Sequence, residues 1–276
     1  MISVLKLSML ALSFYSTLAE AKTGTRAFQQ SSGGGAVIIP TQSSFNTEQE
    51  DGLLVNPQLT ESPLSILADD FDHAMVVMNQ DDNDIHVGNL LSACEKLQST
   101  IRELGFVSSA NDMASNIAKV RNTYSKLPIT QRDSMPALLK YEQDVGITEK
   151  DRIKDSSATM GILWLGRSIN YQRDMFLYIL EHPEASPYDA ASHAYGATVK
   201  PHLSWPLQRL GQAALNGLRS MQKETILAHM GGFDEKEYNS AKDCATRQRM
   251  RRVLASWNPI IRRWNQVLED MGLEKL

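Results

Sequence analysis

From Pro63 almost to the end of the chain, apolar residues recur at intervals of three and four, and this period restricts the fold more than any other feature. The first run consists of Leu64, Leu67, Phe71, Met75 and Met78. Such spacing places apolar side chains on one face of an α-helix, whereas a half-buried strand alternates every second residue. We find no convincing alternation of that kind and no repeat of roughly 20–50 residues. The pattern therefore predicts an all-α fold of about eight helices in one domain.

Capping and breaking residues divide this region. The acidic run 81–84 predicts a turn after the first helix, Gly105 ends the second, and Ser109 or Asn111 caps the third. The expected helices cover residues 64–78, 86–104, 109–126, 134–144, 156–180, 187–199, 203–217, 220–230 and 235–271. Pro259 is expected to kink or break the last of them.

The first 63 residues differ from the rest. Residues 1–21 are typical of a signal peptide, with Lys6 before a short apolar stretch and Ala19-Glu20-Ala21 as a cleavage site. Residues 22–63 are polar and unpatterned, which predicts a disordered linker, and residues 64–276 form the folded domain. We expect the secretory pathway or secretion. A plastid reached through a bipartite signal, or the cytoplasm if residues 1–21 are not a signal, are the alternatives.

Composition and the absence of known motifs argue against several classes of function. The net charge of -4 argues against a globally basic nucleic-acid binder. The six histidines lack metal-ligand spacing, and no nucleophile elbow, phosphate-binding loop or zinc-protease motif is found, so we expect no enzyme, cofactor or metal. Cys94 and Cys244 are the whole supply of cysteine. Free thiols are favoured, although an oxidising compartment would permit one bridge.

Three local features remain. Asp112, Asn116 and Lys119 share one helix face, where they can exchange hydrogen bonds with a polar ligand or simply be a capping acid and a solvated lysine. Trp164 and Arg167 lie three residues apart. The indole suits stacking on a sugar and Arg167 suits pairing with Asp112, whereas a core tryptophan with a snorkelling arginine is the plainer interpretation.

The third feature is Ala194-Tyr195 followed by His202 and Trp205. His202 suits a hydrogen bond to an amide carbonyl and Trp205 a membrane boundary, but a single histidine is more often structural. Further on, arginines between residues 247 and 263 alternate with Trp257 and Trp264. They predict either a solvated helix face or weak attraction to anionic membranes.

In this order and spacing, the features resemble the glycolipid transfer protein family. The matching segments are Asp112-x-x-x-Asn116-x-x-Lys119, Leu138-Leu139-Lys140-Tyr141-Glu142, Leu163-Trp164-Leu165-Gly166-Arg167, and Ala194-Tyr195 with Trp205. The resemblance implies a two-layer helical sandwich that encloses an apolar lipid pocket. It also implies headgroup binding by Asp112, Asn116, Lys119 and Trp164, and membrane docking by Trp205.

One position departs from the family pattern. The family's amide-binding histidine stands two residues before that tryptophan, where this chain has Leu203, and the histidine is one residue earlier at His202. On a helix this displacement turns the imidazole by about 100°. Either the backbone compensates and His202 still binds the lipid amide, or the amide carbonyl loses its partner.

The resemblance implies a monomer that binds a sphingolipid or glycolipid, touches membranes transiently, and transfers its ligand without catalysis. The ceramide-1-phosphate branch of the superfamily typically has basic residues where this chain has Asn116 and Trp164. A phosphate prefers cations and a sugar prefers an aromatic face, so glycosylceramide is favoured over ceramide-1-phosphate. The alternatives are ceramide-1-phosphate transfer, or a sensing or interaction module that has lost transfer, for which Leu203 is the best support.

Overall fold

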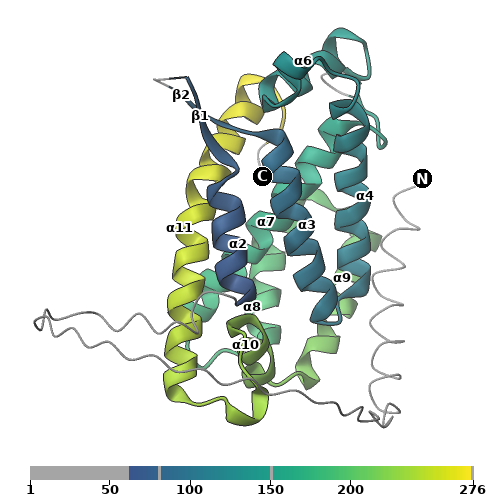
Figure 1. The fold of residues 1–276 in the computed structure, drawn as a ribbon. Helices are drawn as coiled ribbons and strands as arrows, with labels where there is room; N and C mark the ends of the chain where they lie inside the picture. Colours follow the sequence, from purple (N-terminus) through teal and green to yellow (C-terminus); the bar gives the residue numbers. More distant parts are fainter. Residues whose placement is uncertain (1–61, 80–81, 150–151, 275–276) are drawn as a thin grey trace, which may run out of the picture.

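The computed structural model describes residues 62–79, 82–149 and 152–274 (Figure 1). The predicted signal peptide, and all but the last two residues of the predicted linker, lie outside the described residues. Within them the chain is all-α, as the periodicity predicted, and has ten α-helices. They are α2 (Pro63–Asp72), α3 (Val87–Glu103), α4 (Val107–Tyr124), α5 (Ile129–Arg132), α6 (Met135–Asp144), α7 (Ala158–Glu181), α8 (Pro187–Ala194), α9 (Trp205–Leu215), α10 (Lys223–Gly231) and α11 (Ser240–Asp270).

Side-chain caps explain where several helices begin. The hydroxyls of Ser62, Ser134 and Ser157 each accept a hydrogen bond from a backbone N–H three residues on, and Ser186 forms a capping box with Asp189. The cap predicted for α4 is wrong. This helix begins at Val107, after Phe106 and without a side-chain cap, so Ser109 lies inside it.

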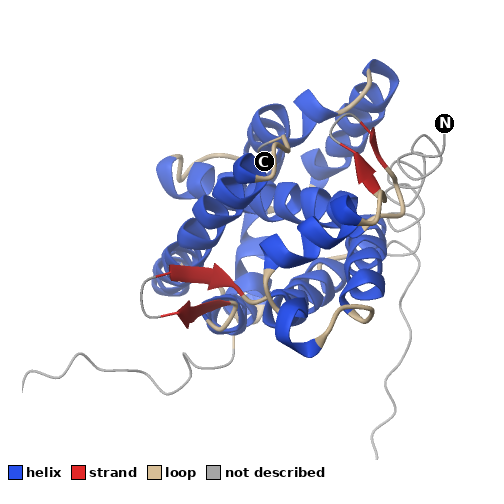
Figure 2. Ribbon diagram, turned by 90° about the horizontal axis from the view of Figure 1, so that it is seen from above, coloured by secondary structure: helices blue, strands red, loops and turns tan. Residues whose placement is uncertain are grey.

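The first predicted helix is too long. α2 ends at Asp72, and the chain then forms an antiparallel ribbon of β1 (Met75–Asn79) and β2 (Asp82–Ile85), in which Met75 faces Ile85. The β-branched pair Val76-Val77 favours extended backbone, and this preference overrides the helical spacing of the methionines. A second ribbon joins β3 (Thr148–Glu149) to β4 (Arg152–Ile153). Figure 2 shows both ribbons at the periphery of the helical body.

The helices form two layers joined at one edge. In Figure 1, α2, α3 and α4 lie side by side in front, and α7 lies behind them with α8 and α9. The long helix α11 packs against both α2 and α7. At this junction Trp257 of α11 stacks on Phe176 of α7 at a centroid distance of 5.5 Å and meets Phe71 of α2 edge-on at 5.4 Å.

The last helix, α11, differs from two expectations. α11 runs unbroken through Pro259, so a break, one of the two outcomes expected there, does not occur. Trp257 and Ile260, on either side of Pro259, are fully buried and hold the helix in the core. The arginine-rich face is only partly solvated. Arg251 and Arg252 are exposed, but Arg249 is buried and donates a hydrogen bond to the Gly231 carbonyl.

The two cysteines are free thiols, as expected, with Cys94 buried in α3 and Cys244 exposed on α11. In the described part of the chain, no helix combines the length and apolar character needed to cross a bilayer. Three His, Cys, Asp or Glu side chains arranged to hold a metal ion are likewise not found among the described residues.

Candidate functional site

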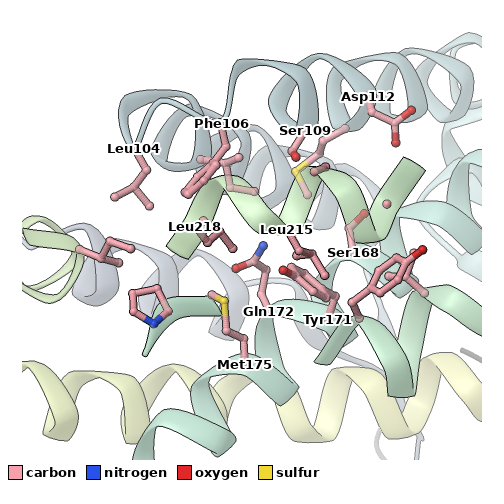
Figure 3. A pocket seen from close by; sticks show the side chains of 18 of the residues that line it. Leu104, Phe106, Ser109, Asp112, Ser168, Tyr171, Gln172, Met175, Leu215 and Leu218 are labelled. Atoms are coloured by element: carbon pink, nitrogen blue, oxygen red, sulfur yellow. The ribbon is translucent and has the colours of Figure 1, made fainter. Parts of the chain in front are cut away.

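An apolar cavity of about 240 Å³ lies between the layers (Figure 3). One face of α7 forms its longest wall, with Trp164, Arg167, Ser168, Tyr171, Gln172, Met175 and Ile179. These positions follow the three-four spacing of a helix face, and Trp164 to Ile179 spans about 22 Å at 1.5 Å per residue. Residues of α3, α4, α8, α9 and α10 and of the turns between helices complete the lining. The cavity is therefore long, mostly apolar and enclosed by several helices.

One end of the cavity is polar, and there Asp112 of α4 lines the wall and is connected to two further predicted residues of the same helix, Asn116 and Lys119. Asn116 donates to Asp112 Oδ2 at 3.3 Å, and Lys119 Nζ donates to Asn116 Oδ1 at 3.1 Å. Lys119 also lies 3.5 Å from Asp155 Oδ1, and its side chain is mostly buried. Asp112 lines the cavity and Asn116 is buried. The structure thus joins the three side chains into one network, and the interpretation of Lys119 as a solvated surface residue is wrong.

A close approach of α4 and α7 brings this network to Trp164. A Cβ added to Gly161 would stand 2.7 Å from the Asn116 carbonyl oxygen, so glycine alone fits at the crossing without displacement. Trp164 follows three residues later on α7 and lines the same cavity as Asp112. The aromatic and the polar parts of the predicted site are therefore brought together by the packing of two helices.

Arg167 lies beside Trp164, with its guanidinium carbon 5.1 Å from the ring centroid. Its carboxylate partner is Glu274, to which Nη2 donates at 2.8 Å, and not Asp112 as the sequence suggested. Burial lowers the pKa of Arg167 below its ordinary value, and the negative charge of Glu274 opposes that shift. Arginine stays protonated in proteins, so the pair is ionic.

His202 is held by the same carboxylate. It ends a 3-10 turn, Lys200–His202, which follows a π-helical turn, Tyr195–Val199. Its Nδ1 lies 2.9 Å from Glu274 Oε1, whereas Leu203, which is extended, lines the cavity. The rotation of about 100° that a regular helix would give does not apply, because the turn is not α-helical. The backbone does not place His202 in the cavity wall.

Trp205 begins α9 and is 67% exposed, with the Arg209 guanidinium carbon 5.2 Å from the ring centroid. It is one of four large exposed hydrophobic side chains among the described residues. An exposed indole beside a cation is suited to the headgroup region of a membrane. The position is compatible with the expected docking role.

Two cavity residues, and one residue that contacts the cavity wall, were missed from the sequence. Figure 3 shows Tyr171 and Gln172 projecting into the cavity, and neither has a hydrogen-bond partner in the part of the chain that the structure describes. Burial raises the pKa of the Tyr171 hydroxyl, which stays neutral. Helical spacing from Trp164 could have identified both. Glu274 had no local signal, since it lies 107 positions from its partner Arg167.

Comparisons with known proteins agree on one family. The model of the family described as Glycolipid transfer protein (GLTP) matches residues 85–231, more than half of the chain. Comparison with curated protein sequences gave no match. Several solved structures that are similar to this chain have the glycolipid transfer protein fold.

One is FAPP2, whose structure concerns how it selects simple glycosphingolipids; it has a TM-score of 0.65 at 18% identity over 78% of this chain and 98% of that one. The human ceramide-1-phosphate transfer protein in complex with ceramide-1-phosphate has a TM-score of 0.62 at 13% identity over 76% and 97%. Arabidopsis accelerated-cell-death 11 with the same class of ligand has a TM-score of 0.62 at 16% identity over 78% and 98%. The chain belongs to the glycolipid transfer protein family.

Proposed function

We propose that this protein binds a sphingolipid and carries it between membranes without changing it chemically. The observation that carries the proposal is a long apolar cavity whose polar end holds Asp112, Trp164 and Arg167. The apolar walls suit lipid chains, and the polar end suits a headgroup. Membership of the family supports this class of ligand.

We propose glycosylceramide as the favoured ligand. Asp112, Asn116 and Lys119 together offer acceptors and donors for sugar hydroxyls and for the ceramide amide. The indole of Trp164, at the same end of the cavity, offers an apolar face and one N–H donor to a sugar ring. His202 was expected to bind the amide, and its Nδ1 lies 2.9 Å from Glu274 Oε1, beside the proposed headgroup site.

Ceramide-1-phosphate is the second candidate, because similar folds bind it and because Lys119 and Arg167 are cations at the polar end. Both of these cations already face carboxylates, Asp155 and Glu274 respectively. A phosphate would have to share or displace those partners, whereas a neutral sugar would not. This difference favours the sugar.

Vesicle-to-vesicle transfer tests the proposal. Donor vesicles carry labelled glucosylceramide or ceramide-1-phosphate, and the rate of arrival in acceptor vesicles is measured. We expect faster transfer of glucosylceramide. Trp164→Ala should lower that rate roughly fivefold, from the loss of an aromatic contact of about 1 kcal/mol, while Trp164→Phe retains most of it.

Unchanged transfer by Trp164→Ala would exclude the stacking role. If no sphingolipid moves, the transfer function is excluded. If, in addition, native mass spectrometry detects no lipid uptake, the alternative of an interaction module without ligand is supported. Leu203 in the cavity wall is the observation in favour of that alternative.

We further propose a monomer that docks transiently on membranes through Trp205 and reaches the secretory pathway through residues 1–21. A plastid or the cytoplasm are the alternatives. Locating a C-terminally tagged full chain, together with sequencing the N-terminus of the mature protein, distinguishes the three. An intact N-terminus on a cytoplasmic protein would exclude the signal peptide.

A further inference from the structure

Glu274 lies near the C-terminus, yet its carboxylate reaches the polar end of the cavity. Oε2 accepts from Arg167 at 2.8 Å, and Oε1 lies 2.9 Å from His202 Nδ1. The side chain of Glu274 is 65% exposed, whereas those of Arg167 and His202 are 6% and 12% exposed. One accessible carboxylate therefore bridges two largely buried nitrogen groups.

The chemistry of this bridge matches that of an anionic headgroup. Carboxylates and phosphates both bind a guanidinium through charge-assisted hydrogen bonds, and they compete for the same donors. Arg167 lines the cavity beside Trp164, so a phosphate at the polar end would meet this guanidinium. Glu274 already occupies one of its N–H groups.

The other charged side chains at the polar end of the cavity do not make a phosphate more favourable there. Lys119 faces Asp155 and Asn116, and Asp112 adds a second carboxylate to the cavity wall. A phosphate brought here must either displace Glu274 from Arg167 or remain close to its negative charge. A neutral sugar meets neither obstacle.

We infer that Glu274 is a specificity-determining residue, a built-in counter-ion that disfavours phosphate headgroups and so selects neutral glycolipids. The inference rests on the proposed function and concerns the choice between its two ligand classes. It assigns to the C-terminal segment a role in headgroup selection that depends on the carboxylate charge.

The decisive variant is Glu274→Gln, which preserves size and removes the charge. Transfer of ceramide-1-phosphate and of glucosylceramide is measured in parallel with the full chain. We expect ceramide-1-phosphate transfer to rise on the order of tenfold, the effect of one charge-assisted hydrogen bond made available. Glucosylceramide transfer should change much less. A gain of this kind cannot result from partial unfolding.

Two further variants show whether charge is the cause. Glu274→Asp keeps the carboxylate and should retain discrimination against the phosphate. Adding Arg167→Gln to Glu274→Gln should abolish the gain, because the guanidinium set free by the first change is then absent. This double variant removes both partners together and leaves no buried charge unpaired.

Glu95→Gln is the matched control. Glu95 forms a 2.6 Å ion pair with Arg121, and neither residue lines the cavity. This variant should leave the ratio of the two transfer rates unchanged.

If Glu274→Gln transfers glucosylceramide but gains no ceramide-1-phosphate transfer, the inference is wrong and the proposed function stands. Equal gains in Glu274→Gln and Glu95→Gln would also overturn it, because the effect would then be one of net charge. If the unchanged protein already prefers ceramide-1-phosphate, Glu274 does not exclude phosphates. Failure of every variant to transfer either lipid would overturn both proposals.

Discussion

Gly161 of α7 lies directly against the backbone carbonyl of Asn116 in α4, where a Cβ would stand 2.7 Å from the oxygen. The contact sets the separation of the two helices at the level of the candidate headgroup site. Asn116 belongs to the hydrogen-bonded network of that site, and Trp164 is one helical turn from Gly161. The crossing therefore connects the packing of the fold to the geometry of the site.

Replacing Gly161 with alanine should force α4 and α7 apart. We expect a loss of about 1–3 kcal/mol in the free energy of unfolding, the usual cost of overpacking, together with slower lipid transfer. Urea denaturation and the vesicle assay measure the two effects. Gly196→Ala is the control, since nothing lies within 4 Å of a Cβ there. Equal stability of the two variants would contradict the close contact.

Glu142 is a second buried anchor. Its carboxylate accepts hydrogen bonds from the backbone N–H groups of Ala158 and Thr159, at 2.7 and 2.8 Å, and from the Thr123 hydroxyl at 2.8 Å. It thereby satisfies donors at the N-terminus of α7, the helix that carries Trp164. In Glu142→Gln the amide NH2 faces groups that are themselves hydrogen-bond donors. The change should therefore lower the free energy of unfolding by about 1–3 kcal/mol.

Chemical denaturation measures that loss. The exposed Glu181 at the other end of α7 supplies the control, Glu181→Gln, which should change stability by less than about 0.5 kcal/mol. A stable Glu142→Gln variant would show that the carboxylate is dispensable.

The two thiols should differ in reactivity. Burial raises the pKa of Cys94 to about 12, and Cys244 is exposed. Because the thiolate is the reactive form, Cys94 remains protonated and unreactive at pH 8. A disulfide exchange reagent should modify Cys244 alone in the native protein and both thiols in denaturant. Rapid modification of Cys94 in the native state would contradict its burial.

Trp205 and Trp164 should affect different steps. Trp205 is exposed and does not line the cavity, so Trp205→Ala should reduce sedimentation with vesicles and slow transfer while leaving lipid affinity unchanged. Trp164→Ala should reduce affinity and leave vesicle sedimentation intact. Lipid affinity is measured separately by native mass spectrometry. If both variants lose vesicle binding equally, the two roles are not separable.

Gln172 lines the apolar cavity, and its amide has no hydrogen-bond partner among the residues that the structure describes. Gln172→Leu should therefore raise the free energy of unfolding by about 1 kcal/mol and favour transfer of lipids with unsubstituted chains. Gln208→Leu should instead lower the free energy of unfolding, because the Gln208 amide donates hydrogen bonds to the Lys200 and Leu203 carbonyls. Thermal denaturation of both variants tests the contrast. A destabilised Gln172→Leu protein would reveal a structural role for the amide.

Much of the helical fold was predictable, and the failures have physical causes. The helices expected at 134–144 and 187–199 begin close to their predicted starts, at Met135 and Pro187, because the serine caps that start them are local interactions. Met75 has the helical spacing but lies in a strand, because the extended preference of Val76-Val77 and the pairing of β1 with β2 together override that spacing. The helix through Pro259 persists because of the buried residues around it.

The candidate site was likewise predictable only in part. The spacing of Asp112, Asn116 and Lys119 correctly predicted a shared helix face, and the structure joins them by hydrogen bonds. Pairing with Asp112 was one of two interpretations of Arg167, whereas in the structure its partner is Glu274.

The sequence by itself determined the all-α class, most helix positions and the family, because helical periodicity, caps and short motifs are properties of neighbouring residues. Only the tertiary structure decided that Gly161 meets Asn116, that Leu203 rather than His202 lines the cavity, and that Glu274 holds Arg167. These contacts join residues far apart in the chain or depend on the course of an irregular turn. Their distances, and hence their electrostatic energies, exist only once the helices have packed.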